Sequence, residues 1–189
     1  MRYVQLIVTI GVSTAVMLGL MYLNTYSIDH VFWSETRLYM ALVMGSAMTI
    51  VMLSFMSGMY QNRLLNLAVF AASLVVFAVS LYLVRSQTTI DSTAYMRAMI
   101  PHHSIAIMTS ERAGIEDVRV QQLASGISET QRKEIREMEW LIDDIEANGV
   151  ARTTTEAAIR PVPTFATETP FEIKPELNNV KGEIVAYVR

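Results

Sequence analysis

Three long apolar runs near the N-terminus constrain the fold of this chain more than any other feature. They cover residues 4–23, 38–59 and 64–84, and none of them contains Asp, Glu, Lys, Arg or His. A helix of about 20 apolar residues is long enough to cross a bilayer core of about 30 Å. A span in lipid must satisfy its own backbone hydrogen bonds, so each run is predicted to be a transmembrane helix. Residues 1–86 are therefore predicted to form a three-span anchor in the lipid bilayer.

Two patterns within these runs concern helix packing. Gly11, Ala15 and Gly19 recur at every fourth position and predict a face on which a neighbouring helix can approach closely. In the second run methionine also recurs at every fourth position, from Met40 to Met56. Steps of four residues drift around a helix through about 160° in total, so these methionines share no single face. Packing or contact with lipid is favoured for them over a path for metal ions.

The charges that flank the runs predict the orientation of the anchor. Arg2 and Arg63 lie on one side of the membrane, whereas the first loop, on the other side, carries Asp29 and Glu35. Basic residues are retained preferentially on the cytoplasmic side. The N-terminus is therefore predicted to lie inside the inner (cytoplasmic) membrane, and the residues after 85 are predicted to be periplasmic.

The composition excludes several classes of function. The chain is 52% hydrophobic, its net charge is −3 and it contains no cysteine. Because no basic patch occurs, nucleic acid is not expected as a partner. Without cysteine there is neither a disulfide framework nor a thiolate metal site. Any site for a soft metal must therefore use other side chains.

Residues 87–149 predict an antiparallel helical hairpin outside the membrane. Asp91 is a good N-cap for a first helix that ends near residue 113, and Gly149 is a good terminator for a second helix over about 118–148. The turn between them is short, so the helices should pack side by side. Two helices of this length bury little core, and a homodimer that pairs two hairpins is predicted.

The C-terminal segment, residues 150–189, holds four of the five prolines. It is predicted to be an extended and poorly ordered tail, with at most a short strand at residues 183–188. The predicted fold class is therefore all-α, with three transmembrane helices, a helical hairpin and an extended tail.

The first hairpin helix concentrates unusual chemistry in Met96, Met99, His102 and His103. On a helix, Met96, Met99 and His103 fall within a stripe about 60° wide, and His102 lies about 60° to the other side of Met99. Thioether sulfur favours Cu(I), and imidazole accepts copper or zinc. The alternative is structural, because methionine is an ordinary core residue and a single histidine on an apolar face is commonly hydrogen-bonded.

The second hairpin helix carries Gln131, Glu134 and Met138 on or beside its apolar stripe. Counted from the turn, these residues lie at a depth comparable to that of His103, so they can meet it across the hairpin. Met138 is a candidate ligand. Glu134 could accept a hydrogen bond from an imidazole N–H and orient the ring, with Gln131 beside it, or it could be a half-exposed flank residue.

Together these residues resemble the bacterial family catalogued as domain of unknown function 305, over about residues 90–149. The pattern consists of Asp91, Tyr95, Met96, Met99, Ile100, Pro101, His102, His103, Ala106 and Ile107, followed by Gln131, Glu134, Ile135 and Met138. The resemblance implies a helical, ferritin-like domain, which is half of a four-helix bundle here, exported or membrane-anchored, with copper-binding members linked to copper resistance.

The chain departs from that family pattern at two places. Thr109 stands where the family often has methionine, and Met108 is one position early. Trp140 follows Met138 by two residues, whereas the family's tryptophan usually follows by three. One soft ligand of the family pattern is therefore missing, and neither Met108 nor Trp140 is carried over as a site residue.

The predicted function is that of a membrane-anchored periplasmic copper-binding protein for storage, delivery or tolerance, and no catalytic residues are predicted. Met99, His102, His103 and Met138 would hold Cu(I), with Met96 as an outer or transfer ligand, and zinc is the second metal considered. One alternative is a non-catalytic interaction or sensor module whose His-Met cluster is structural. A ferritin-like di-iron oxidase is disfavoured, because neither histidine has Glu three residues before it.

Overall fold

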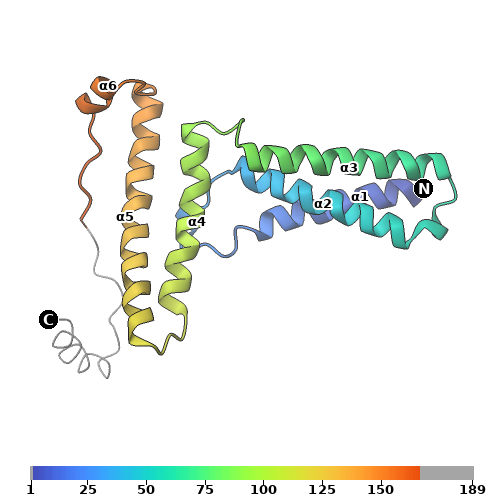
Figure 1. Ribbon diagram of the computed structural model, residues 1–189, viewed down its shortest axis with the longest axis horizontal. Helices are drawn as coiled ribbons and strands as arrows, with labels where there is room; N and C mark the ends of the chain where they lie inside the picture. Colours follow the sequence, from blue (N-terminus) through green and yellow to red (C-terminus); the bar gives the residue numbers. More distant parts are fainter. Residues whose placement is uncertain (1, 167–189) are drawn as a thin grey trace. The chain divides into compact units, whose positions relative to one another are not determined.

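The computed structural model describes residues 2–166, and over that range the chain is helical and contains no strand. Figure 1 shows the six α-helices. They are α1 (Arg2–Leu20), α2 (Glu35–Phe55), α3 (Arg63–Ser86), α4 (Ser92–Arg112), α5 (Val118–Asn148) and α6 (Thr154–Ile159). Two short 3-10 turns, Ile28–His30 and Ser57–Met59, precede and follow α2. The prediction of an all-α fold is confirmed.

The chain divides into two compact units. The first contains the residues up to Leu23 together with Trp33–Ala98, and the second contains Asn24–Phe32 together with the chain from Met99 onward. The loop that connects α1 to α2 thus groups with the second unit, although its place in the sequence is within the predicted anchor. The division also falls inside α4, between its second and third turns.

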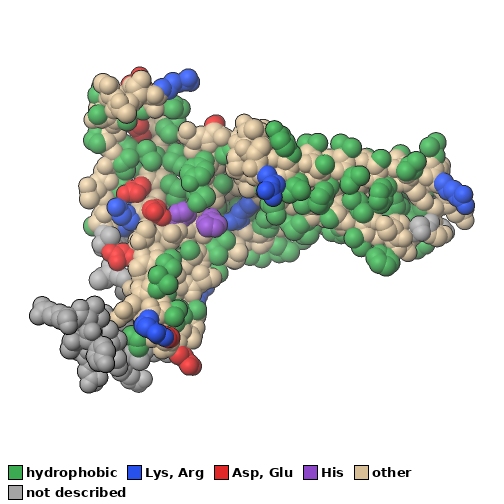
Figure 2. All heavy atoms as spheres, in the orientation of Figure 1, with side chains coloured by type: hydrophobic (Ala, Val, Ile, Leu, Met, Phe, Trp, Pro, Cys, Tyr) green, Lys and Arg blue, Asp and Glu red, His purple; other side chains and the backbone are tan. Residues whose placement is uncertain are grey.

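Three helices of the first unit, α1 to α3, are long and apolar enough to cross a membrane. Large hydrophobic side chains cover the visible face of this unit (Figure 2). Within this unit Phe55 and Leu64 are 88% and 77% exposed, a level that suits contact with lipid better than contact with water. Three apolar helices of this kind indicate a membrane anchor.

The ends of these helices differ by a few residues from the predicted runs because caps, not apolar content, determine them. Ser34 accepts a hydrogen bond from the Arg37 amide and starts α2 three residues early. Asn62 caps α3 in the same way, through the Leu65 amide. At the other end of α3, Gln87 adopts a left-handed conformation, with φ of 54°, and ends the helix.

The close approach of α1 and α2 depends on a different glycine from those predicted. A Cβ atom added at Gly45 would overlap the Thr14 hydroxyl and would lie 3.3 Å from Thr14 Cβ. A Cβ atom at Gly11 or Gly19 would meet nothing within 4 Å. The prediction that the glycines of α1 form the contact face is therefore wrong, because helix spacing alone does not show which face meets a neighbour.

In the second unit, α5 runs back alongside the later turns of α4 (Figure 1). Asp117 caps α5 by accepting the Arg119 amide, and Gly149 ends it with a φ of 78°. The core between the two helices is formed by residues that are at most 6% exposed. They are Ile100, Ser104 and Ile107 from α4 and Ala124, Ser128, Ile135 and Ile142 from α5.

The chain beyond α5 is more regular than predicted up to residue 166. Thr153 accepts a hydrogen bond from the Glu156 amide and starts α6, and the Glu156 carboxylate accepts the Arg152 amide. Arg160 then forms an ion pair with Asp144 of α5, with 2.7 Å between Nη1 and Oδ2. The prediction of an extended tail is thus wrong for α6, where capping outweighs the nearby prolines. The short strand considered at 183–188 lies outside the described residues.

Candidate functional site

His103 lies at the junction of α4 and α5, where both of its ring nitrogens have partners. Nδ1 is 2.9 Å from the carbonyl oxygen of Met99, one turn earlier in α4. Nε2 is 2.9 Å from Glu134 Oε2 on α5. The imidazole is 12% exposed, and the Glu134 side chain is 42% exposed. The Met99 carbonyl and the Glu134 carboxylate therefore fix the ring between the two helices.

The hydrogen-bond chemistry of these partners determines where the protons of His103 lie. A backbone carbonyl only accepts, so Nδ1–H must donate to Met99. The other ring nitrogen, Nε2, is the atom that faces Glu134 Oε2. A metal ion could bind Nε2 only after Glu134 moves aside.

Glu134 has a second neighbour on its own helix. Gln131 Nε2 lies 3.4 Å from the same carboxylate oxygen, Oε2, that His103 contacts. The three side chains Gln131, Glu134 and His103 thus lie together. Because Glu134 is partly exposed, its carboxylate can leave the ring nitrogen without crossing packed core.

The other candidate ligands surround this pair less directly. His102 is exposed, and its ring lies edge-on to that of His103 with 5.9 Å between centroids. Met99 and Met138 are half-buried, and each lies about one helical turn from His103 or Glu134 respectively. Met96 is only 6% exposed and belongs to the part of α4 that groups with the first unit.

The donor set restricts the metal that this place could hold. Within the part of the chain that the structure describes, no three side chains of His, Asp or Glu converge as a metal site. A hard cation prefers several oxygen ligands, and a di-iron site needs several carboxylates. The candidate ligands near His103 on the two helices include the thioethers of Met99 and Met138, a class of ligand that favours Cu(I).

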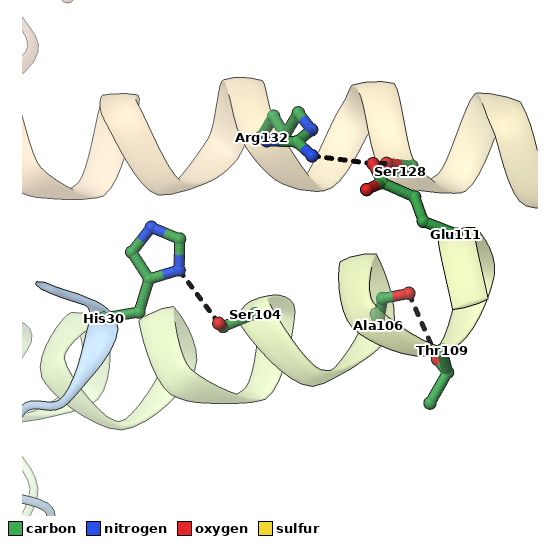
Figure 3. A network of polar contacts seen from close by, with 7 residues as sticks. All are labelled: His30, Ser104, Ala106, Thr109, Glu111, Ser128 and Arg132. Atoms are coloured by element: carbon green, nitrogen blue, oxygen red, sulfur yellow. Dashed lines mark hydrogen bonds and ion pairs between the residues drawn. The ribbon is translucent and has the colours of Figure 1, made fainter. Parts of the chain in front are cut away.

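A second polar cluster, which the sequence did not predict, lies between the Asn24–Phe32 loop and α4 (Figure 3). The Tyr26 amide donates to Ser104 Oγ across 2.7 Å. His30 Nδ1 lies 2.9 Å from the same Ser104 oxygen. No spacing rule could have found these contacts, since more than 70 residues separate the loop from Ser104. His30 was visible in the sequence only as a histidine in a polar loop.

The same cluster continues through an ion pair between α4 and α5 (Figure 3). Glu111 Oε1 accepts hydrogen bonds from Arg132 at 2.7 Å and from Ser128 at 2.6 Å. The Arg132 guanidinium also lies over the Tyr26 ring, 4.8 Å from its centroid. Burial by itself would raise the pKa of Glu111, but the hydrogen bonds from Ser128 and Arg132 outweigh it, and the pKa lies below its usual value.

The Ser104–His30 contact does not form a nucleophilic site. Ser104 is 0% exposed, so no substrate can reach its hydroxyl. Its oxygen already accepts the Tyr26 amide, whereas an activated serine needs a lone pair directed at a substrate. Burial also lowers the pKa of His30, with Asp29 opposing and Arg132 reinforcing that shift. The contact therefore suits a structural role for a neutral imidazole.

Comparison with known proteins identifies one part of the chain. Residues 91–171 match the model of a family described as a domain of unknown function (DUF305). A stretch of 74 residues, 38% of this chain, is 36% identical to an uncharacterized protein of Acanthamoeba polyphaga mimivirus. That stretch spans 49% of the viral protein, so the chain covers about half of its length. No solved structure matches the chain.

The family match agrees with the resemblance carried by residues 90–149 and extends it through α6. It covers α4, α5 and α6 and excludes α1 to α3. The match therefore concerns the second half of the chain and supports that domain family there.

Proposed function

We propose that this protein is a membrane-anchored copper-binding protein that holds Cu(I) through histidine and methionine side chains, for copper storage, delivery or tolerance. The observation that carries the proposal is the orientation of His103. Its Nδ1–H donates to the Met99 carbonyl, which leaves Nε2 directed at α5. Metal-binding histidines typically donate their other N–H to a carbonyl or carboxylate in this way.

The neighbouring sulfur atoms supply the remaining chemistry. Met99 and Met138 lie one turn from His103 and Glu134, and His102 is exposed beside His103. Two thioethers and one or two imidazoles form a soft ligand set that favours Cu(I) over hard cations. Met96 would act as an outer or transfer ligand. Zinc is the competing metal, because imidazole binds it as well.

In this proposal Glu134 controls access to the metal-binding nitrogen. Binding of Cu(I) at Nε2 displaces the carboxylate, because Glu134 Oε2 lies 2.9 Å from that nitrogen, where a metal ion would have to bind. Gln131, 3.4 Å from Oε2, offers the displaced carboxylate a hydrogen bond. Both residues therefore tune the site without acting as ligands.

The three apolar helices would hold the metal domain at the membrane surface. The positive-inside rule, applied to Arg2 and Arg63, favours an N-terminus inside the inner membrane and a periplasmic second unit. Exposed Val120, Leu123 and Ile127 form an apolar stripe on α5. We infer that a second copy of the chain covers it in a homodimer, which would complete a ferritin-like four-helix arrangement.

A second function is supported by one specific observation. Both ring nitrogens of His103 already have protein partners, so the His103–Glu134 pair could simply link α4 to α5. In that case the chain would be a non-catalytic interaction or sensor module. The two functions differ in one measurable property, which is tight binding of Cu(I) by the intact protein.

The test is an anaerobic titration of the full chain in detergent with Cu(I), against a competing chromogenic chelator. His103→Ala should weaken Cu(I) binding by about 10- to 100-fold or more, because changes to a site's surroundings alone have that effect. Met99→Leu and Met138→Leu keep the side-chain volume and should weaken it as well. Met108→Leu is the matched control, on α4 but outside the candidate set, and should bind as the wild type does.

Two outcomes would contradict the proposal. Absence of Cu(I) binding by the wild-type chain would favour the interaction or sensor function. Zn(II) affinity equal to or above that for Cu(I) would refute a copper-specific site. A His103→Ala variant that unfolds is uninformative about ligation, and in that case the two methionine variants decide.

A further inference from the structure

The Asn24–Phe32 loop connects α1 to α2 in the sequence but packs with α4 and α5 in the second unit. One buried atom, Ser104 Oγ, holds the loop at two points, namely the Tyr26 amide and His30 Nδ1. Figure 3 shows the His30 ring and Ser104 facing each other. None of the candidate metal ligands belongs to this loop.

The hydrogen bonds of Ser104 determine the protonation state that suits the closed loop. Ser104 Oγ accepts the Tyr26 amide and keeps one proton of its own, which it can donate to His30 Nδ1 when that nitrogen is unprotonated. A neutral imidazole with its proton on Nε2 satisfies this geometry. Protonation of Nδ1 would direct an N–H at the hydroxyl and leave the proton of a fully buried Ser104 without its acceptor.

Charged groups on the two sides of His30 have opposite effects on its pKa. Within the loop, Asp29 raises the pKa because it favours the imidazolium. From α5, Arg132 disfavours it, although Glu111 of α4 partly balances that guanidinium. Asp29 also acts on Glu139 of α5, whose pKa is raised by burial, by Asp143 and by Asp29. Burial outweighs Asp29 at His30 and keeps the imidazole neutral.

We propose that His30 is a pH-sensitive latch: neutral His30 holds the Asn24–Phe32 loop on the second unit through Ser104, and protonation of His30 releases the loop. The latch lies within the second unit, between its Asn24–Phe32 loop and α4. It would open as the surroundings of that unit become acidic.

The direction of the effect follows from proton linkage. The pKa of His30 is lowered in the closed loop, so the open loop binds the proton more tightly. Closure is then fully favoured above the ordinary value of 6.5 and weakens as pH falls below it. The opening equilibrium constant rises by up to about tenfold for each pH unit between the ordinary pKa and the lowered one.

Hydrogen exchange of the full chain in detergent tests the latch. Protection of the loop amides, above all that of Tyr26, is measured at about pH 7.5 and about pH 5.5, on either side of the ordinary histidine pKa. Rates are corrected for the intrinsic pH dependence of exchange. In the wild type, protection of the loop should fall by up to about tenfold at the lower pH, and protection of α5 should stay constant.

The variants separate protonation from packing. His30→Gln keeps an acceptor near Ser104 but cannot be protonated in this range, so its loop should stay protected at both pH values. Asp29→Asn removes the carboxylate that favours the imidazolium and should shift the opening to lower pH. His30→Ala lacks the acceptor and should leave the loop unprotected at both pH values.

Two results would overturn the proposal. One is equal protection of the wild-type loop at both pH values. The other is a loss of protection at low pH in His30→Gln that matches the wild type. If His30→Ala does not fold, the comparison of the wild type with His30→Gln still decides.

Discussion

At the scale of single residues, the three histidines of this chain occupy three different environments. His103 has a carbonyl and a carboxylate oxygen 2.9 Å from its two ring nitrogens, His102 is exposed, and His30 lies 2.9 Å from a buried serine hydroxyl. Sequence reasoning placed His102 and His103 together with methionine because helix spacing is regular. It could not assign their protons, since those depend on Glu134 and Ser104, which reach the rings only in the folded chain.

The Glu111–Arg132 pair provides a residue-scale prediction. The two side chains are 15% and 22% exposed, so Glu111→Gln leaves a charge that is largely buried and loses its partner. The free energy of unfolding should fall by about 1–3 kcal/mol, less than for a fully buried pair, measured by circular dichroism during denaturation. The matched control, Asp117→Asn, keeps a capping side chain in an exposed pair and should leave the unfolding midpoint unchanged.

The pH dependence of that difference has a definite sign. The pKa of Glu111 is lowered in the folded state, so its contribution is fully present above the ordinary value of 4.5. It is lost as pH falls through the lowered value. The stability of the wild type should therefore approach that of Glu111→Gln on acidification, and a gap that is constant with pH would show that the ion pair is not its cause.

At the scale of secondary-structure elements, local sequence signals were sufficient to predict where the long helices lie. The three apolar runs correspond to α1 to α3, and α5 ends just before Gly149, as predicted. Local sequence signals do not predict which distant elements come into contact. The Asn24–Phe32 loop meets Ser104 across more than 70 residues, and its sequence is short and polar like many exposed loops. Similarly, three small residues on α1 predicted a contact face. The residue of α1 that meets Gly45 of α2 is instead Thr14, which no sequence pattern singled out.

The contact between Gly45 and Thr14 provides a prediction at this scale. Gly45→Ala places a methyl group against the Thr14 hydroxyl, and overpacking of this kind costs about 1–3 kcal/mol. The unfolding midpoint in a denaturing detergent titration should fall. Gly11→Ala is the matched control, because it faces open space and gains helix propensity, so its midpoint should stay or rise.

A second substitution distinguishes the contact from a general effect of Gly45. Thr14→Ala removes the hydroxyl and the methyl group that the new side chain would meet, so it should recover part of the loss in Gly45→Ala. Equal destabilisation by Gly45→Ala with and without Thr14 would mean that the two helices do not meet at this point.

At the scale of the whole molecule, the chain joins an apolar unit to a polar one that carries the family match. The chain passes between them three times, at the two ends of the Asn24–Phe32 loop and within α4. A fragment that begins at α4 would lack Tyr26 and His30, so it would leave Ser104 without the partners that it has in the intact chain. Binding and stability are for that reason best measured on the full chain.

The proposed homodimer is the last property that belongs to this scale. Val120, Leu123 and Ile127 are 45%, 63% and 37% exposed and lie on one face of α5. An exposed apolar stripe of this kind is typical of a helix that packs against a partner, and a second copy anchored in the same membrane would present the same stripe. Leu123→Glu should therefore convert a dimer into a monomer of 21.2 kDa without loss of helicity.

The molar mass of the protein in detergent, determined by light scattering after correction for bound detergent, checks this expectation. Ile159→Glu is the matched control, because Ile159 is 76% exposed but lies on α6, away from the stripe, and the variant should remain dimeric. A wild-type chain that is monomeric at every concentration would refute the homodimer. The stripe would then need a different partner, because lateral contact between copies would not cover it.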